Sequence, residues 1–257
     1  LDSADVWSRP EKFLLNDQLE PTALAGCPPD SFSKDGQMWG NPIYDWPHMK
    51  DHEYEWWIER LRYISSLYDI TRIDHFRGFD SYYSIDAAAA TAAQGHWEKG
   101  PGLTFFRHVE SKLGKLSLIA EDLGFMSDSV RQLVKDTGFP GMKVFEFAFD
   151  EPDSTYLPEH YDKNCFAYIG THDNDTLKGW LSSLDEQTLV KVKKYVHLEK
   201  DEILSEKIMS VMADSDAKAV IFQMQDILGL GTESRMNIPS TVKDNWTWRM
   251  TEKDLSF

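Results

Sequence analysis

The sequence of 257 residues has little cysteine and no long apolar run. Its two cysteines, Cys27 and Cys165, fit no metal-ligand spacing, and we expect reduced thiols, as in a cytosolic protein, with a disulfide between them as the open alternative. No stretch of about 18 apolar residues is present, so no membrane-spanning helix is expected. A secretory signal sequence is also not recognisable, and these absences together predict a cytoplasmic protein.

Basic residues are scarce as well. The chain has 27 Lys and Arg against 43 Asp and Glu, a net charge of −16. Binding to nucleic acid or to an anionic membrane requires clustered positive charge, so neither is expected as a partner. Aromatic residues are plentiful instead, with 9 Trp and 10 Tyr. They suit the stacking of sugar rings, although a Trp-rich core explains any single Trp equally well.

Sequence patterns predict a loop region followed by alternating strands and helices. Residues 10–50 are rich in Pro and Gly and are expected to be irregular. Helical periodicity covers 56–67, 104–113, 127–135, 185–197 and 200–213, with a helical turn within 86–94. Apolar runs predict strands near 70–73, 116–120, 142–149, 166–170 and 219–224. This alternation indicates an α/β fold with a parallel sheet, and five strands are three fewer than a closed eight-stranded barrel needs.

Carboxylates follow three of these strands. Asp74, Glu121 and Asp173 each stand where an apolar run ends. The carboxyl ends of strands in a parallel α/β barrel meet at one mouth, so distant residues can act together there. Two acids that act as nucleophile and proton donor are the requirement of glycoside chemistry. The sequence therefore predicts an enzyme that remodels a sugar polymer.

The neighbours of the three acids suit these roles. Arg72 lies two residues before Asp74 on a strand, so it can hold the aspartate ionised, although a structural ion pair is the alternative. Burial of Glu121 near Asp122 and other acids is expected to raise its pKa, as a proton donor requires, whereas a helix-capping acid is the alternative. His172 and Asp173 can grip sugar hydroxyls. A metal site at His172 lacks further ligands, so neither a metal nor a cofactor is predicted.

Eight segments occur in the order found in one enzyme family. They are residues 36–46 (GQMWGNPIYDW), 72–79 (RIDHFRGF), 120–124 (AEDLG), 139–144 (FPGMKV), 170–175 (GTHDND), 225–231 (QDILGLG), 234–237 (SRMN) and 245–249 (NWTWR). The ordered set resembles glycoside hydrolase family 77, the 4-α-glucanotransferases known as amylomaltases or disproportionating enzymes. The resemblance implies a TIM (β/α)8 barrel with family-specific insertions, of which residues 1–257 would form about strands 4–8.

The resemblance also assigns roles to individual residues. It implies that Asp74 is the nucleophile, Glu121 the acid/base and Asp173 the acid that stabilises the transition state. The substrate-binding residues that it implies are Arg72, His172 and Asn237 at the cleavage point, Asp122 near the acceptor, Gln37, Trp39, Asn41 and Tyr44 on a loop over the acceptor side, and Phe147 at the acceptor. His75 is expected only to orient its neighbours.

The implied reaction is retaining transfer of an α-1,4-glucan segment to an acceptor glucan or glucose through a covalent glucosyl-enzyme. Maltooligosaccharides are thus the expected partners. Because the first barrel strands of the family have no counterpart here, we expect the chain to be a fragment, completed by a companion fragment or by a copy of itself. Two alternatives stay open, namely a hydrolase of the α-amylase type and a non-catalytic carbohydrate-binding fragment.

Overall fold

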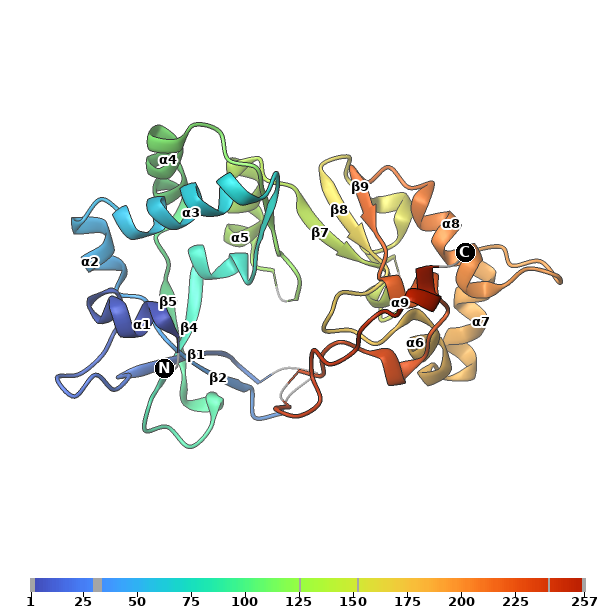
Figure 1. Cartoon of the computed structure of the whole chain (residues 1–257), viewed down its shortest axis with the longest axis horizontal. Helices are drawn as coiled ribbons and strands as arrows, with labels where there is room; N and C mark the ends of the chain where they lie inside the picture. Colours follow the sequence, from blue (N-terminus) through green and yellow to red (C-terminus); the bar gives the residue numbers. More distant parts are fainter. Residues whose placement is uncertain (1–2, 30–33, 125, 152, 240, 256–257) are drawn as a thin grey trace. The chain divides into compact units, whose positions relative to one another are not determined.

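The structure is a computed structural model that describes residues 3–29, 34–124, 126–151, 153–239 and 241–255 (Figure 1). The chain forms two compact units, Leu1–Phe139 and Pro140–Phe257, and each is described by itself. Within the described ranges, no helix has both the length and the apolar character needed to cross a membrane.

The first unit combines helices with two small sheets. Its elements are α1 (Ala4–Ser8), η1 (Pro10–Lys12), β1 (Ala23–Cys27), β2 (Gln37–Pro42), α2 (Trp46–Asp51), α3 (Glu55–Leu67), β3 (Thr71–Ile73), η2 (Phe76–Phe79), β4 (Ser81–Asp86), η3 (Ala92–Gln94), β5 (His96–Lys99), α4 (Gly102–Leu113), β6 (Leu118–Ala120) and α5 (Asp128–Thr137). One sheet is antiparallel in the order β2-β1-β4-β5, and the other is the parallel pair β3-β6.

The antiparallel sheet was not expected from the sequence of the first 100 residues. The segment expected to be irregular contains β1 and β2, and the turn expected within 86–94 is reduced to η3. Gly26 weakens the strand pattern of β1. A Cβ at this position would clash with the backbone oxygen of Gln37 on β2. The close approach of the two strands therefore requires glycine, which local propensity disfavours in a strand.

An aromatic core holds the first unit together. Trp46, Trp57, Phe79 and Phe105 are buried, with ring centroids 5.1–6.1 Å apart in the contacting pairs. Edge and offset contacts of this kind add stability beyond the burial of apolar area. Two of the nine Trp, Trp46 and Trp57, therefore serve this core, whereas Trp7, Trp39, Trp97 and Trp246 are exposed. The helix expected over 56–67 is confirmed as α3, and those that end near Gly114 and begin at Ser127 are confirmed as α4 and α5.

The second unit is built around a parallel three-stranded sheet. Its elements are β7 (Gly141–Val144), η4 (Phe145–Phe147), η5 (Pro158–His160), β8 (Cys165–Tyr168), α6 (Leu177–Ser183), α7 (Glu186–Tyr195), α8 (Leu204–Ala213), β9 (Ala219–Ile221), α9 (Met224–Ile227), η6 (Thr232–Ser234) and η7 (Glu252–Leu255). The sheet order is β7-β8-β9 (Figure 1). Side chains of α7 and α8 share an apolar core with β8.

All five expected parallel strands are present, but with shorter bounds. The strand expected over 142–149 ends at Val144, because the chain turns into η4. The strand expected over 219–224 ends at Ile221, before α9. Helix α6 was not expected, since its seven residues include Gly179 and two serines that weaken a helical pattern.

Candidate active site

Two parallel strands in the first unit bring Asp74 and Glu121 to the same edge. Strands β3 and β6 pair in register, with Ile73 opposite Ala120, so each acid is the first residue after its strand. Backbone hydrogen bonds continue past the strands: the N–H of Glu121 donates to Ile73 O at 3.0 Å, and the N–H of Phe76 donates to Glu121 O at 3.0 Å. The local backbone around both acids is therefore tied together.

Asp74 faces solvent and is paired with Arg72. The guanidinium of Arg72 donates to Asp74 Oδ1 at 2.6 Å, as the two-residue spacing on a strand predicts. The side chain of Asp74 is 75% exposed and that of Arg72 is 26% exposed. A charge-assisted hydrogen bond to one oxygen orients the carboxylate and leaves its other oxygen available to a ligand.

Glu121 is less accessible and is held by two backbone donors. Its Oε2 accepts from the N–H of His75 at 2.6 Å, and its Oε1 accepts from the N–H of Leu123 at 2.9 Å. Burial raises the pKa of Glu121, and the charge of Asp74 adds to this, while the two N–H donors and Arg72 oppose it. The direction agrees with the expectation, and Asp74 is one of the nearby acids that contribute to it. A carboxyl group with a raised pKa is suited to proton donation.

The residues expected on the acceptor side occupy different surroundings. Gln37, Trp39 and Asn41 lie on β2, where Trp39 Nε1 donates to Gln37 Oε1 at 3.1 Å. The ring of Trp39 packs against His75, the residue that follows Asp74, with centroids 4.8 Å apart. Tyr44 instead packs against the aromatic core, with its ring centroid 5.3 Å from that of Trp46. Its contact with a sugar stays a prediction.

Asp173 in the second unit is surrounded by donors. Asn237 Nδ2 donates to Asp173 Oδ1 at 2.6 Å, and His172 Nε2 lies 3.3 Å from Asp173 Oδ2. His172 and Asp173 lie on a turn that is closed by Asn174, whose Oδ1 accepts hydrogen bonds from the backbone N–H and from the Oγ1 hydroxyl of Thr171. The structure thus brings Asn237 to Asp173 although 64 residues separate them in the chain.

Arg235 is a residue of this group to which the sequence patterns assign no role. One of its N–H groups donates to the backbone oxygen of Asp173 at 2.6 Å and another to that of Asn237 at 2.8 Å. A guanidinium can hold two acceptors in a fixed geometry. The only signal in the sequence is its place in the SRMN segment, which does not say what it contacts.

Glu146 is a second residue that the sequence patterns do not mark. Burial raises its pKa to about 9, and the charges of Asp226 and Asp175 add to this, although a hydrogen bond from Asn174 opposes it. The carboxyl group lies against Gly170, where a Cβ would stand 2.8 Å from Oε1. Glu146 therefore lies directly against the turn before Asp173, where Gly170 leaves room for its carboxyl group. Its neighbour Phe147 was expected on a strand, but it lies in η4. The ring of Phe147 packs against that of Tyr156, with centroids 5.6 Å apart.

Asp122 follows Glu121 in the chain and is partly buried. Asp74 and Glu121 belong to the first unit, and Asp173, His172 and Asn237 belong to the second. In the part of the chain that the structure describes, no group of three or more His, Cys, Asp or Glu is arranged to hold a metal ion.

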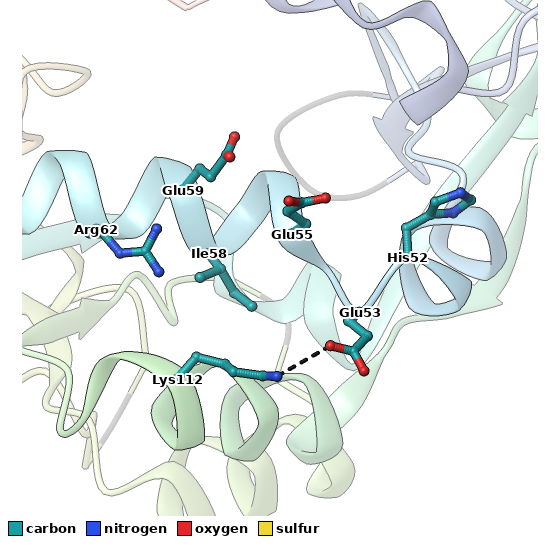
Figure 2. Close-up of a pocket in the computed structure, with 7 residues that line it drawn as sticks. All are labelled: His52, Glu53, Glu55, Ile58, Glu59, Arg62 and Lys112. Carbon is teal, nitrogen blue, oxygen red and sulfur yellow. Dashed lines mark hydrogen bonds and ion pairs between the residues drawn. The ribbon is translucent and has the colours of Figure 1, made fainter.

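A pocket elsewhere in the first unit has a different character. It is lined by His52, Glu53, Glu55, Ile58, Glu59, Arg62 and Lys112, and Lys112 pairs with Glu53 at 3.2 Å (Figure 2). None of the candidate catalytic residues lines it. It also offers no Trp, Tyr or Phe face for a sugar ring, so it does not fit the expected substrate.

Comparisons with known proteins point to one family. The family of glycoside hydrolase 77, described as 4-alpha-glucanotransferase, matches residues 1–254. A 4-alpha-glucanotransferase of Clostridium butyricum is 47% identical over 96% of this chain and 52% of its own length. One of Streptococcus pneumoniae strain TIGR4 is 48% identical over 99% of this chain and 51% of its own length. The chain thus spans about half the length of the curated relatives that it matches.

Solved structures show the same likeness. An amylomaltase from Streptococcus agalactiae in complex with acarbose superposes with a TM-score of 0.96 and 41% identity, over 99% of this chain and 52% of its own. An amylomaltase from Corynebacterium glutamicum has a TM-score of 0.76 at 20% identity, over 95% of this chain and 40% of its own, which supports the fold alone.

Proposed function

This chain belongs to the 4-alpha-glucanotransferase family, glycoside hydrolase family 77, and on that premise we propose that it supplies the catalytic acids of a retaining 4-α-glucanotransferase. The observation that carries the proposal is the pairing of β3 with β6, which places an exposed, Arg-bound aspartate beside a carboxyl group of raised pKa. A retaining mechanism needs one carboxylate that acts as the nucleophile and one carboxyl group that donates a proton.

The first step cleaves the donor glucan. The carboxylate of Asp74 attacks the anomeric carbon of a glucose unit, and the bond from that carbon to the 4-oxygen of the next unit breaks. Glu121 gives its proton to the departing oxygen. The products are a glucosyl ester on Asp74 and a shortened glucan with a free 4-hydroxyl.

The second step transfers the bound segment. Glu121, now ionised, takes the proton from the 4-hydroxyl of an acceptor glucan or glucose, whose oxygen attacks the anomeric carbon. The ester bond breaks and the carboxylate of Asp74 is restored. Two inversions give net retention, for which the carboxyl groups should be about 5–5.5 Å apart. Neither step needs a cofactor.

The second unit is proposed to serve the same reaction. Asp173, fixed through its side chain by Asn237, would stabilise the positive charge of an oxocarbenium-like transition state. His172 and Asn237 are proposed to hold hydroxyls of the same sugar, and Arg72 to hold both Asp74 and the sugar. Gln37, Trp39, Asn41, Asp122, Tyr44 and Phe147 are proposed as acceptor contacts.

The whole protein is proposed to be a (β/α)8 barrel to which this chain contributes about strands 4–8. Within the described residues, β3 pairs with β6 alone. Large apolar side chains near the end of α3 and the start of β3 are exposed, namely Tyr63, Leu67, Tyr68 and Ile70. A companion segment with the preceding barrel strands, or a second copy of this chain, would cover these side chains and extend the sheet.

Maltotriose provides the test of the proposed function. We expect the whole protein to convert it into a ladder of shorter and longer maltooligosaccharides, because each glucosyl-enzyme is captured by a sugar. Chromatography of the products measures the ladder. Release of glucose and maltose without longer products would instead identify a hydrolase of the α-amylase type, and binding without turnover would identify a carbohydrate-binding protein.

Trp39 is expected to exclude water from the glucosyl-enzyme. Replacing it by Ala should raise the ratio of hydrolysis to transfer with maltotriose by about tenfold, since small changes near reacting atoms have effects of this order. The measurement compares glucose release with ladder formation. Trp7→Ala is the matched control, because Trp7 is 82% exposed on α1. A ratio that stays at the wild-type value in Trp39→Ala would contradict the proposed shield.

A further inference from the structure

His75 connects two parts of the candidate site through one residue. Its backbone has φ 48° and ψ 52°, in the left-handed region that few residues other than glycine adopt and that His tolerates better than most. This conformation points the N–H of His75 at Glu121 Oε2, 2.6 Å away. The turn after the proposed nucleophile thus determines the orientation of the proposed proton donor.

The side chain of the same residue contacts Trp39. The two rings are edge to face, with centroids 4.8 Å apart and planes at 81°. Burial lowers the pKa of His75 to about 4, with Arg77 acting in the same direction and Asp74 against it, so the imidazole is neutral at physiological pH. A neutral ring packs against an indole as an aromatic partner, without the desolvation cost of a charge.

We propose that His75 is a positioning residue that seats Trp39 beside the turn holding Glu121 and thereby controls whether the glucosyl-enzyme reacts with a sugar or with water. The inference rests on the proposed function and deepens it. Among the residues that the structure describes, the indole N–H of Trp39 donates to Gln37 on its own strand, a contact that does not tie Trp39 to the turn. The ring of His75 thus links Trp39 on β2 to the turn that holds Glu121.

The test removes the ring while keeping the backbone. In His75→Asn the left-handed conformation and the N–H to Glu121 can persist, because Asn also tolerates this region. We expect the hydrolysis-to-transfer ratio with maltotriose to rise by about tenfold, as in Trp39→Ala. The double variant should show the ratio of Trp39→Ala alone, since a residue that acts through Trp39 has no further effect without it.

Three further variants keep the inference falsifiable. His75→Phe retains an aromatic edge and should keep the ratio near the wild-type value. His52→Asn makes the same substitution at an exposed site outside the candidate active site and should change nothing. If His75→Asn does not fold, His75→Gly removes the ring at a position where glycine adopts the left-handed conformation readily.

Two results would overturn the inference. One is a folded His75→Asn or His75→Gly protein with the wild-type ratio, and the other is a double variant whose change is the product of the two single changes. A ladder from the wild-type protein together with either result would refute the role of His75 alone. Absence of a ladder from the wild-type protein would refute the proposed function itself, and the inference with it.

Discussion

Replacing Asp74 by Asn is expected to reduce the disproportionation of maltotriose by roughly 10⁴-fold or more, as losses of a nucleophile do in other enzymes. The amide cannot form the ester intermediate, although it can still accept a hydrogen bond from Arg72. Asp69→Asn is the matched control, because Asp69 is an exposed aspartate just before β3. Substantial turnover by Asp74→Asn would refute the role assigned to this residue.

A chemical rescue makes this prediction more specific. In Asp74→Ala, azide can take the space of the missing carboxylate and attack an α-maltosyl fluoride, whose fluoride leaves without proton donation. A single displacement inverts the configuration, so the expected product is the β-maltosyl azide. Nuclear magnetic resonance of the product distinguishes the anomers. The α-anomer would show that another residue serves as the nucleophile.

Replacing Glu121 by Gln is expected to have an effect of similar size on the turnover of maltotriose but a much smaller one on the first step with α-maltosyl fluoride, measured as a burst of fluoride release. The glutamine cannot give a proton to a sugar leaving group, whereas fluoride needs none. The ester on Asp74 should then accumulate, because the acceptor hydroxyl lacks its base. In Glu121→Ala, azide should attack the anomeric carbon of the ester on Asp74 and release the sugar as the α-maltosyl azide, the product of two inversions. The β-azide would contradict the role of Glu121.

The pH profile of the wild-type protein offers an independent check on Glu121. The proton donor must be protonated in the first step, so kcat/KM for maltotriose should fall as pH rises through the pKa of Glu121. Because burial raises that pKa, the fall should lie above the ordinary range of a glutamate near 4.3. With α-maltosyl fluoride this fall should disappear. Glu59→Gln, at an exposed position on α3, should leave both profiles unchanged.

The elements that sequence patterns predicted well are those whose signals are local. Helix α5 begins after Ser127, whose Oγ accepts from the N–H of Val130, and ends at Gly138 in the left-handed conformation. Such caps depend on residues a few positions apart. The short apolar runs before Asp74, Glu121 and Asp173 are equally local, and they located the strands β3, β6 and β8 to within a few residues.

The elements that sequence patterns missed depend on pairing between distant residues. Strand β1 exists because Leu24 pairs with Ile85 on β4 and Gly26 pairs with Met38 on β2. Only the folded chain brings these partners together, and β-strand formation depends strongly on such surroundings. The same holds for Arg235, because its two acceptors are the backbone oxygens of Asp173 and Asn237, which no side-chain pattern reveals.

The sequence by itself determined which acids are available, the strands they follow and the family to which their order belongs. The tertiary structure decided what surrounds each of them. Because β3 pairs in parallel with β6, Asp74 is exposed to solvent next to Arg72, whereas Glu121 is partly buried. The left-handed turn at His75 directs its backbone N–H to the carboxyl group of Glu121. A pKa depends on burial and on the nearest charges and donors, and these are properties of the folded chain.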